Sequence, residues 1–88
     1  MKINNGFVLR RVAETYIVLP LLQKTIKFNG MLTLNESGAM LWKKLESGCS
    51  EDDLVSALTD EYEVDEKTAR EDVKKLIAKL CEAGCITL

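Results

Sequence analysis

The feature that most constrains the fold of this chain is residues 28–38, where a strand-like run passes directly into the start of a helix. Asn29 and Gly30 favour the positive φ angles of a tight turn, and residues 31–34 form the strand that follows it. Asn35 is a good N-cap for a helix. The sequence before this junction favours strands and the sequence after it favours helices. We therefore predict an α+β fold in which the sheet comes first.

Two more strands are predicted before the junction. Residues 7–12 and 16–19 are rich in β-branched and aromatic side chains, and the short polar connection between them indicates an antiparallel pair. Pro20 ends the second strand because proline donates no hydrogen bond to a ladder. A strict two-residue turn before the third strand would put the apolar residues of its two arms on different faces. Either the sheet is apolar on both faces, or residues 21–29 form a longer, irregular connection.

Three helices are predicted after the junction. Asn35 caps the first helix, which stops at Gly48. Ser50 caps the second, and three carboxylates in its first turn favour the helix dipole. The third starts at Asp65 and ends at Gly84. The apolar residues that recur at helical spacing, and that we expect to be buried, are Leu41, Trp42, Leu45, Leu54, Ala57, Leu58, Tyr62, Ala69, Val73, Leu76, Ile77 and Leu80.

The length of 88 residues allows a single domain, residues 1–88, near the lower size limit for a fold without disulfides or metal. The longest apolar run, residues 17–22, is too short to span a bilayer, and the polar N-terminus lacks the apolar region of a signal peptide. We therefore expect a cytoplasmic protein. The apolar residues 85–88 are expected to add a short strand or to cover the core.

Three cysteines and no histidine limit the metal chemistry of the chain. Cys81 and Cys85 lie one helical turn apart, which is the spacing of half a site for a soft metal, but Cys49 is far away in sequence. A closed four-ligand site cannot be drawn without carboxylates. We expect all three cysteines to be small, buried or half-buried residues, and we expect no metal site and no cofactor.

The sequence also argues against catalysis. No imidazole is available as a general base, and no glycine-rich loop is present to hold phosphate. The acidic residues are expected mainly on solvated helix faces or at helix caps, and a core of this size can scarcely enclose an active site. We predict that the protein is not an enzyme.

Strands followed by three helices, with a short connection between the second and third, indicate a winged helix-turn-helix-like domain. Such domains often bind DNA, and residues 64–88 carry five basic side chains. The same residues carry five acidic side chains, and residues 50–63 carry six acidic and no basic ones. Because phosphate binding requires a positive surface, DNA binding is the alternative and not the main prediction.

The sequence also resembles a known family. The resemblance extends from Phe7 to Gly84 and is most specific at the junction, residues 28–39. The other segments that carry it are Leu41 and Trp42, residues 62–65, residues 69–73, Leu80 and residues 83–84. This pattern is similar to that of the PqqD family, the small peptide-binding chaperones also called RiPP recognition elements. The chain departs in detail from the proteins that make pyrroloquinoline quinone, so that pathway is not implied.

The resemblance implies a protein that binds the leader segment of a ribosomally made precursor peptide and presents it to a modifying enzyme, commonly a radical S-adenosylmethionine (SAM) maturase. In that family the leader adds to the third strand and lies against the third helix. Carried over to this sequence, the peptide-binding residues are Met31, Leu32, Thr33, Leu34, Arg70, Val73, Leu76, Ile77 and Leu80. Which rim of the helix faces the peptide stays open. A domain split from a larger maturase, or a scaffold subunit, would act by much the same mechanism.

The chemistry of a strand edge supports this mode of binding independently. An unpaired edge offers backbone donors and acceptors to an extended peptide, while neighbouring apolar side chains set its register. The alternative interpretation is that the same strand and helix side chains simply form the core. Residues 1–48 carry seven basic and three acidic groups, so we expect acidic residues in the leader, with Arg70, Lys74 and Lys79 as further partners.

Overall fold

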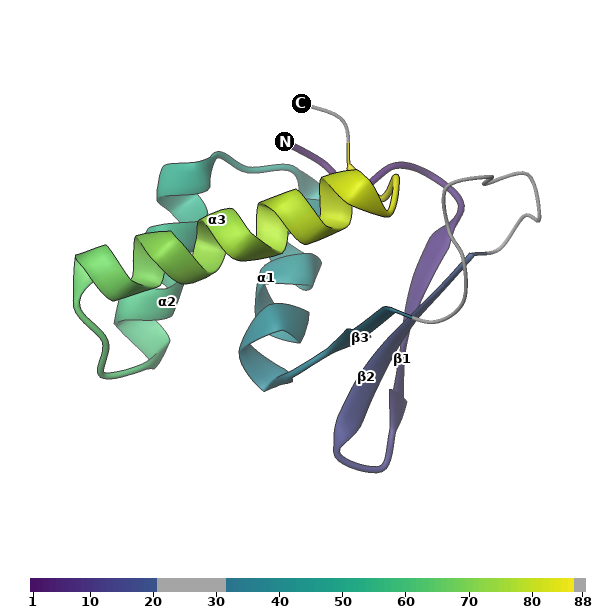
Figure 1. Ribbon diagram of the computed structural model, residues 1–88, viewed down its shortest axis with the longest axis horizontal. Coiled ribbons are helices and arrows are strands. Elements are labelled where there is room, and N and C mark those ends of the chain that lie inside the picture. The colour runs from purple at the N-terminus through teal and green to yellow at the C-terminus, as the bar shows by residue number, and fades with distance from the viewer. Residues whose placement is uncertain (21–31, 87–88) are drawn as a thin grey trace.

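The computed structural model describes residues 1–20 and 32–86. Its elements, in chain order, are β1 (Phe7–Val12), β2 (Thr15–Pro20), β3 (Leu32–Leu34), α1 (Glu36–Ser47), α2 (Glu51–Glu61) and α3 (Glu66–Glu82). The sheet lies at one end of the molecule, α2 and the start of α3 lie at the other, and α1 lies between them (Figure 1). This arrangement confirms the predicted α+β fold. Among the described residues, no helix is long and apolar enough to cross a membrane.

The sheet has the strand order β1-β2-β3, and both pairs of strands are antiparallel. β1 and β2 pair along their whole length, and the turn between them holds Ala13 at a φ of 57°. β3 is shorter and pairs with β2 so that Thr33 lies opposite Ile17. Because β2 is central, β3 has a free outer edge within the part of the chain that the structure describes.

The strand predictions hold with small shifts at the ends. The structure adds Thr15 and Pro20 to the predicted second strand, and Pro20 is its last residue. The third strand is seen from Leu32. Met31, the predicted tight turn and residues 21–29 lie outside the described residues, so the two alternatives for the connection stay open.

The first two helices begin at their predicted caps, and the third begins just after its predicted first residue, Asp65. The three N-cap residues are Asn35, Ser50 and Asp65. At α2 the capping is reciprocal, because the Ser50 hydroxyl accepts from the Asp53 N–H at 3.1 Å while the Asp53 carboxylate accepts from the Ser50 N–H at 3.0 Å. Gly48 ends α1 at a φ of 92°, a conformation that glycine adopts without the strain of a side chain.

The core lies between the sheet and the three helices. Its largest fully buried side chains are Trp42, Leu45, Leu54, Leu80, Val18, Val73 and Cys85. They come from β2, from all three helices and from the segment after α3, so one cluster joins the sheet to the helices. Cys49 and Cys81 are half-buried, as predicted for residues that fill space at helix ends.

Tyr62 corrects the predicted buried stripe of α2. Its side chain is 36% exposed, and its backbone is extended, with a φ of −127°. The helix ends one residue earlier, so helical spacing no longer sets the direction of this side chain. The prediction was wrong at this position because it extended the periodic pattern past the last turn.

The described part of the C-terminal tail behaves as predicted. Cys85 and Ile86 are buried, and Ile86 forms an isolated antiparallel bridge with Ile3. The segment containing Ile3 is held by the helices as well, since the Ile3 N–H donates to the Leu45 carbonyl at 3.0 Å. The start of the chain therefore lies beside the end of α3 (Figure 1).

Candidate functional site

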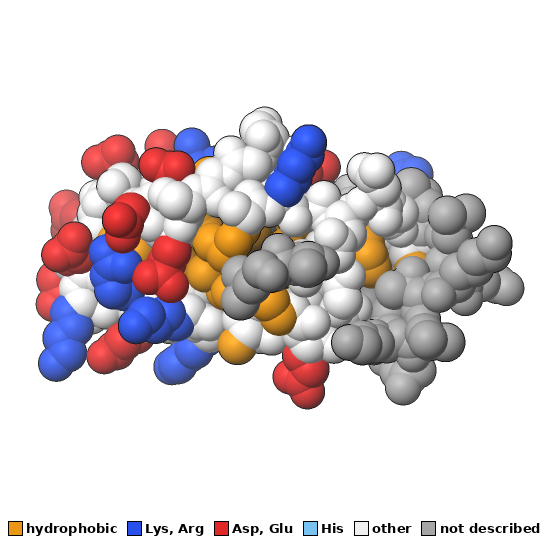
Figure 2. Space-filling model, turned by 90° about the horizontal axis from the view of Figure 1, so that it is seen from above, with side chains coloured by type: hydrophobic (Ala, Val, Ile, Leu, Met, Phe, Trp, Pro, Cys, Tyr) orange, Lys and Arg blue, Asp and Glu red, His pale blue; other side chains and the backbone are white. Residues whose placement is uncertain are grey.

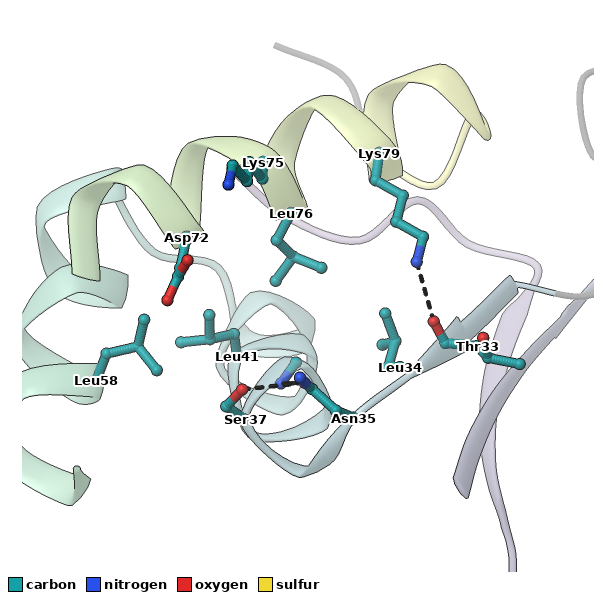
Figure 3. A pocket seen from close by; sticks show the side chains of 11 residues that line it. Thr33, Leu34, Asn35, Ser37, Leu41, Leu58, Asp72, Lys75, Leu76 and Lys79 are labelled. Carbon is teal, nitrogen blue, oxygen red and sulfur yellow. Dashed lines mark hydrogen bonds between the residues drawn. The ribbon is translucent and has the colours of Figure 1, made fainter. Parts of the chain in front are cut away.

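A groove runs along α3 from the end of β3 toward α2, with the start of α1 on the side opposite α3 (Figure 3). Its volume is about 310 Å³. Four parts of the fold line it. They are β3 with Thr33 and Leu34, the start of α1 with Asn35, Ser37, Gly38 and Leu41, α2 with Leu58, and α3 with Asp72, Lys75, Leu76 and Lys79. The groove therefore lies beside the free edge of β3, where an extended chain would find both backbone partners and side-chain contacts.

The free edge is marked by a contact between β3 and α3. The Lys79 ammonium donates a hydrogen bond to the Thr33 carbonyl at 3.1 Å (Figure 3). The Thr33 carbonyl thus faces α3, away from β2. In an antiparallel ladder the N–H of a residue points to the same side as its carbonyl, so the Thr33 N–H also faces the groove. Thr33 offers one donor and one acceptor to an added strand.

The floor of the groove is apolar and its rims are polar. Four leucines form the floor, namely Leu34, Leu41, Leu58 and Leu76, and each is at most 8% exposed. Lys75 and Lys79 stand on the α3 rim, and Asp72 stands nearer to Leu58, at the end of the groove away from β3 (Figure 3). This surface suits a short apolar segment with polar groups on both sides.

The predicted strand-to-helix junction forms the near wall of this groove. The Asn35 amide oxygen accepts from the Gly38 N–H at 2.8 Å and from the Ser37 hydroxyl at 3.0 Å. A Cβ on residue 38 would lie 3.1 Å from that oxygen and 3.3 Å from the Leu34 Cβ. Glycine therefore allows β3 and the first turn of α1 to approach closely, which explains the glycine at position 38.

The structure brings together only part of the predicted site. Thr33, Leu34 and Leu76 line the groove, and Leu32 is half-buried on the same strand. The remaining predicted residues of α3 do not line it. Val73, Ile77 and Leu80 are buried in the core cluster, and Arg70 makes its contacts with α2. Met31 lies outside the described residues.

Arg70 faces the first turn of α2. Its guanidinium donates to Glu51 at 2.8 Å and to Asp52 at 2.9 Å, and Glu66 lies 3.9 Å away. The hydrogen bond to Asp52, together with that to Glu51, raises the pKa of Arg70. The positive charge of Arg70 is therefore balanced within the protein and lies on a different side of α3 from the groove.

Sequence reasoning did not select Asp72 and Lys75 for the site, although both line it. The sequence does contain a signal for these two residues. Residues 72, 75, 76 and 79 recur at the three- to four-residue spacing of a helix, so they share one face of it. That stripe adjoins the core stripe on α3. Its mixed charges made it look like an ordinary solvated face.

Across residues 1–20 and 32–86, no cluster of three or more His, Cys, Asp or Glu side chains could hold a metal ion. Burial raises the pKa of the Cys85 thiol to about 11, and burial followed by the charge of Asp53 raises the pKa of Cys49. Both thiols are protonated at neutral pH, so neither is an activated nucleophile.

Comparison with known proteins identifies the family. The profile of the family described as coenzyme PQQ synthesis protein D (PqqD) matches residues 11–86, which is most of the chain. The chain belongs to the PqqD family. The resemblance drawn from the junction and the helices is thereby confirmed. A search of curated proteins gave no match.

Two solved structures are similar over nearly the whole PqqD-family chain. TbiB1 in complex with the TbiA(beta) leader peptide is 25% identical, with a TM-score of 0.77, and the match covers 97% of this chain and 93% of that one. Lasso peptide synthetase B1, complexed with the leader peptide, is 23% identical, also with a TM-score of 0.77, covering 99% of this chain and 96% of that one. Both have the same fold as this chain.

Proposed function

We propose that this protein binds the leader segment of a ribosomally synthesised precursor peptide and presents it to a modifying enzyme. The leader would add as a strand to the outer edge of β3 and lie in the groove against α3. The observation that carries the proposal is the free edge of β3, whose Thr33 carbonyl faces a groove with an apolar floor. A peptide at this edge gains backbone pairing and side-chain contacts together.

The comparisons support this proposal through family and fold. The PqqD family match covers residues 11–86, and both similar structures are complexes with leader peptides. Because one fold can serve several functions, the shared fold supports this role, and the groove beside β3 carries the proposal.

The contacts that we propose divide into two groups. Met31, Leu32, Thr33 and Leu34 would form the pairing strand, and Leu76 would contact the leader from α3. The other α3 residues of the predicted site would support the wall from behind, because Val73, Ile77 and Leu80 are core residues that fix the helix in place. Arg70 would act in the same way by joining α3 to α2.

The proposed role is that of a binding partner and not of an enzyme, with a radical SAM maturase as the expected modifying enzyme. The groove is open and offers lysine, aspartate, asparagine and hydroxyl groups but no paired acid and base. A short open reading frame beside a radical SAM enzyme gene is expected next to the gene for this chain. The N-terminal leader of the peptide encoded by that short reading frame is the probe for the binding experiments.

Strand addition can be tested at Thr33 without disturbing the rest of the sheet. Thr33→Pro removes an N–H that faces the groove, while the bonds between β2 and β3 remain, because proline is tolerated on an edge strand. We expect leader affinity, measured by calorimetry, to fall about ten-fold or more, since one backbone hydrogen bond and its close approach are lost. Thr33→Val is the matched control, because it keeps the N–H, and it should bind as the wild type does.

Circular dichroism should show that both variants are folded. Normal binding by folded Thr33→Pro would remove the edge of β3 from the site. No binding of the leader to the wild-type protein, in the presence or absence of the maturase, would reject the function itself.

A further inference from the structure

The hydrogen bond between Lys79 and Thr33 occupies a backbone position that an added strand needs. Lys79 reaches from the α3 rim across the groove, and its ammonium lies 3.1 Å from the Thr33 carbonyl oxygen. This carbonyl is the acceptor that Thr33 offers on the free edge of β3. In this structure the groove side of that carbonyl is therefore already hydrogen-bonded to Lys79 (Figure 3).

We propose that Lys79 is a displaceable cap on the edge of β3 and that it selects peptides with an acidic side chain beside Thr33. The proposal rests on the proposed function and adds the chemistry of the ligand. When the peptide binds, its backbone N–H replaces Lys79 at the Thr33 carbonyl, and the released ammonium donates to a carboxylate of the same peptide. One hydrogen bond is exchanged for two, and the ammonium keeps an acceptor throughout.

The charges around the groove favour a carboxylate at this position. Lys75 lies one helical turn before Lys79 and also lines the groove, so two positive charges lie along its α3 rim. Among the described residues, the recorded ion pairs on α3 all belong to Arg70, and Lys79 has none. A peptide without an acidic group would offer the displaced ammonium only water or a neutral oxygen, which is a weaker acceptor than a carboxylate.

Asp72 limits where the acidic residue can lie. It is seven positions before Lys79 on α3, which is about 10 Å along the helix axis. An extended peptide covers that distance in about three residues. We therefore expect one acidic residue beside Lys79, apolar residues over the leucine floor, and no acidic residue about three positions further on, where it would face Asp72.

The probe for this proposal is a phage-displayed library of random peptides, which requires no knowledge of the natural leader. Wild-type protein, Lys79→Met and Lys74→Met are each used to select binders. Lys74→Met is the matched control, because it removes the same charge from an exposed position of α3 that does not line the groove. Selections on the wild type and on Lys74→Met should enrich Asp or Glu at one fixed position, and those on Lys79→Met should not.

A double-mutant cycle then tests the exchange with purified components. The best selected peptide is synthesised with its Glu or Asp, and again with Gln or Asn at that position. Lys79→Met should weaken binding of the acidic peptide about three- to five-fold, the size of one exposed ion pair. It should tighten binding of the neutral peptide, because no cap then has to be displaced. Unchanged binding of the neutral peptide would indicate an ion pair without a cap and would reject the cap. This difference in sign is specific to a displaceable cap.

The outcomes separate this inference from the function on which it rests. If no peptide is enriched on the wild type, or if Thr33→Pro retains the selected peptides, the proposed function at this edge is rejected, and the inference with it. If peptides bind through β3 but without an acidic preference, or if that preference survives in Lys79→Met, only the role of Lys79 is rejected. Equal weakening of the acidic and neutral peptides by Lys79→Met would also reject the cap.

Discussion

At the scale of single residues, Trp42 combines the largest buried side chain with a polar group that lacks a partner. Its side chain is fully buried, and its indole N–H has no hydrogen-bond partner among the residues that the structure describes. An unpaired buried donor costs about 1–3 kcal/mol, which offsets part of the stabilisation from burying the ring. Trp42 therefore stabilises the fold through its volume and not through its nitrogen.

This balance predicts different effects for two substitutions of Trp42. Trp42→Phe removes the unpaired donor while keeping a ring, so we expect a loss of no more than about 1.5 kcal/mol in the free energy of unfolding. Trp42→Ala leaves a cavity and should cost about 3–5 kcal/mol. Urea unfolding followed by far-ultraviolet circular dichroism measures both, since the only tryptophan is lost. A Phe variant as unstable as the Ala variant would contradict the account.

Arg70 shows why one residue of the site was hard to place from sequence. Arg70 and Lys79 both lie on α3, which carries charges of both signs on either side of its buried face. Their positions in the sequence do not tell which of these two sides faces β3. The answer depends on α2, because Glu51 and Asp52 in its first turn pair with Arg70. Because the side of α3 that carries Arg70 faces α2, the side that carries Lys79 faces β3.

The charge of Arg70 is therefore expected to be irrelevant to peptide recognition. Arg70→Met should change the affinity for a selected peptide by less than about two-fold, because a partly exposed charge that is already paired contributes little at a distance. Calorimetric titration of the folded variant measures this. Weakening comparable with that of Thr33→Pro would place the binding surface on the α2 side of α3 instead of at the groove.

At the scale of elements, two carboxyls at the N-termini of α2 and α3 are expected to make stability depend on pH. The Ser50 N–H, which donates to the Asp53 carboxylate, lowers the pKa of that carboxyl below the ordinary 3.8, and the Ser50 hydroxyl lowers it further. Hydrogen bonds with Thr68 lower the pKa of Asp65 in the same way. Each carboxyl stabilises the fold when it is ionised. That contribution is complete when the pH is above the pKa of the carboxyl in the unfolded chain. It disappears as the pH falls through the lower pKa of the same carboxyl in the folded protein.

We therefore expect the melting temperature to change little between neutral pH and about pH 5 and to fall below about pH 4. The variant with both Asp53→Asn and Asp65→Asn should show a shallower fall, because asparagine can still accept a hydrogen bond at a cap but does not titrate. Melting curves across the acid range compare the two proteins. Parallel curves would show that other carboxyls cause the acid sensitivity.

The elements themselves were predictable because their local signals agree with the fold. β1 and the N-caps Asn35, Ser50 and Asp65 fall where turn and capping residues place them. The groove was predictable only in part. Thr33, Leu34 and Leu76 could be assigned to it, but the roles of Asp72 and Lys75 depend on the rotation of α3 about its own axis, which packing against α2 decides.

At the scale of the whole molecule, the first residues connect the two ends of the helical layer. The Met1 ammonium donates to the Cys49 carbonyl at 2.8 Å, and the Cys49 N–H donates back to the Met1 carbonyl at 2.9 Å. The Asn4 N–H donates to the Cys85 carbonyl at 2.7 Å, and its side chain donates to the Gly84 carbonyl at 3.0 Å. This segment therefore joins the loop between α1 and α2 to the end of α3.

Removing residues 1–4 should destabilise the domain strongly. The net loss from these hydrogen bonds is roughly 3–5 kcal/mol, which is a large share of the stability of a domain of this size. We expect a deletion variant to melt at a much lower temperature than the full chain. Lys2→Ala is the control, since Lys2 is exposed in the same segment, and it should melt as the wild type does. A deletion variant as stable as the full chain would show that residues 1–4 contact the helices without stabilising the fold.

The distribution of charge over the whole molecule argues against the DNA-binding alternative. The net charge is −2, and residues 50–63 carry six acidic and no basic side chains. Figure 2 shows acidic and basic side chains intermixed over the end of the molecule formed by α2 and the start of α3, with no basic patch there. Arg70 is also paired internally. The helix that would enter the major groove therefore lacks the positive surface that phosphate contacts require.

We expect no binding of a mixed-sequence DNA duplex at physiological salt, as measured by fluorescence anisotropy. A charge-reversed variant, Asp60→Lys with Glu61→Lys and Glu63→Lys, provides the positive control. It should gain weak binding that falls steeply with salt, because each added lysine can release counterions from the duplex. If the wild type bound the duplex at micromolar concentration with a steep salt dependence, the winged-helix alternative would be restored. The free edge of β3 would then be a feature of the fold without a peptide ligand.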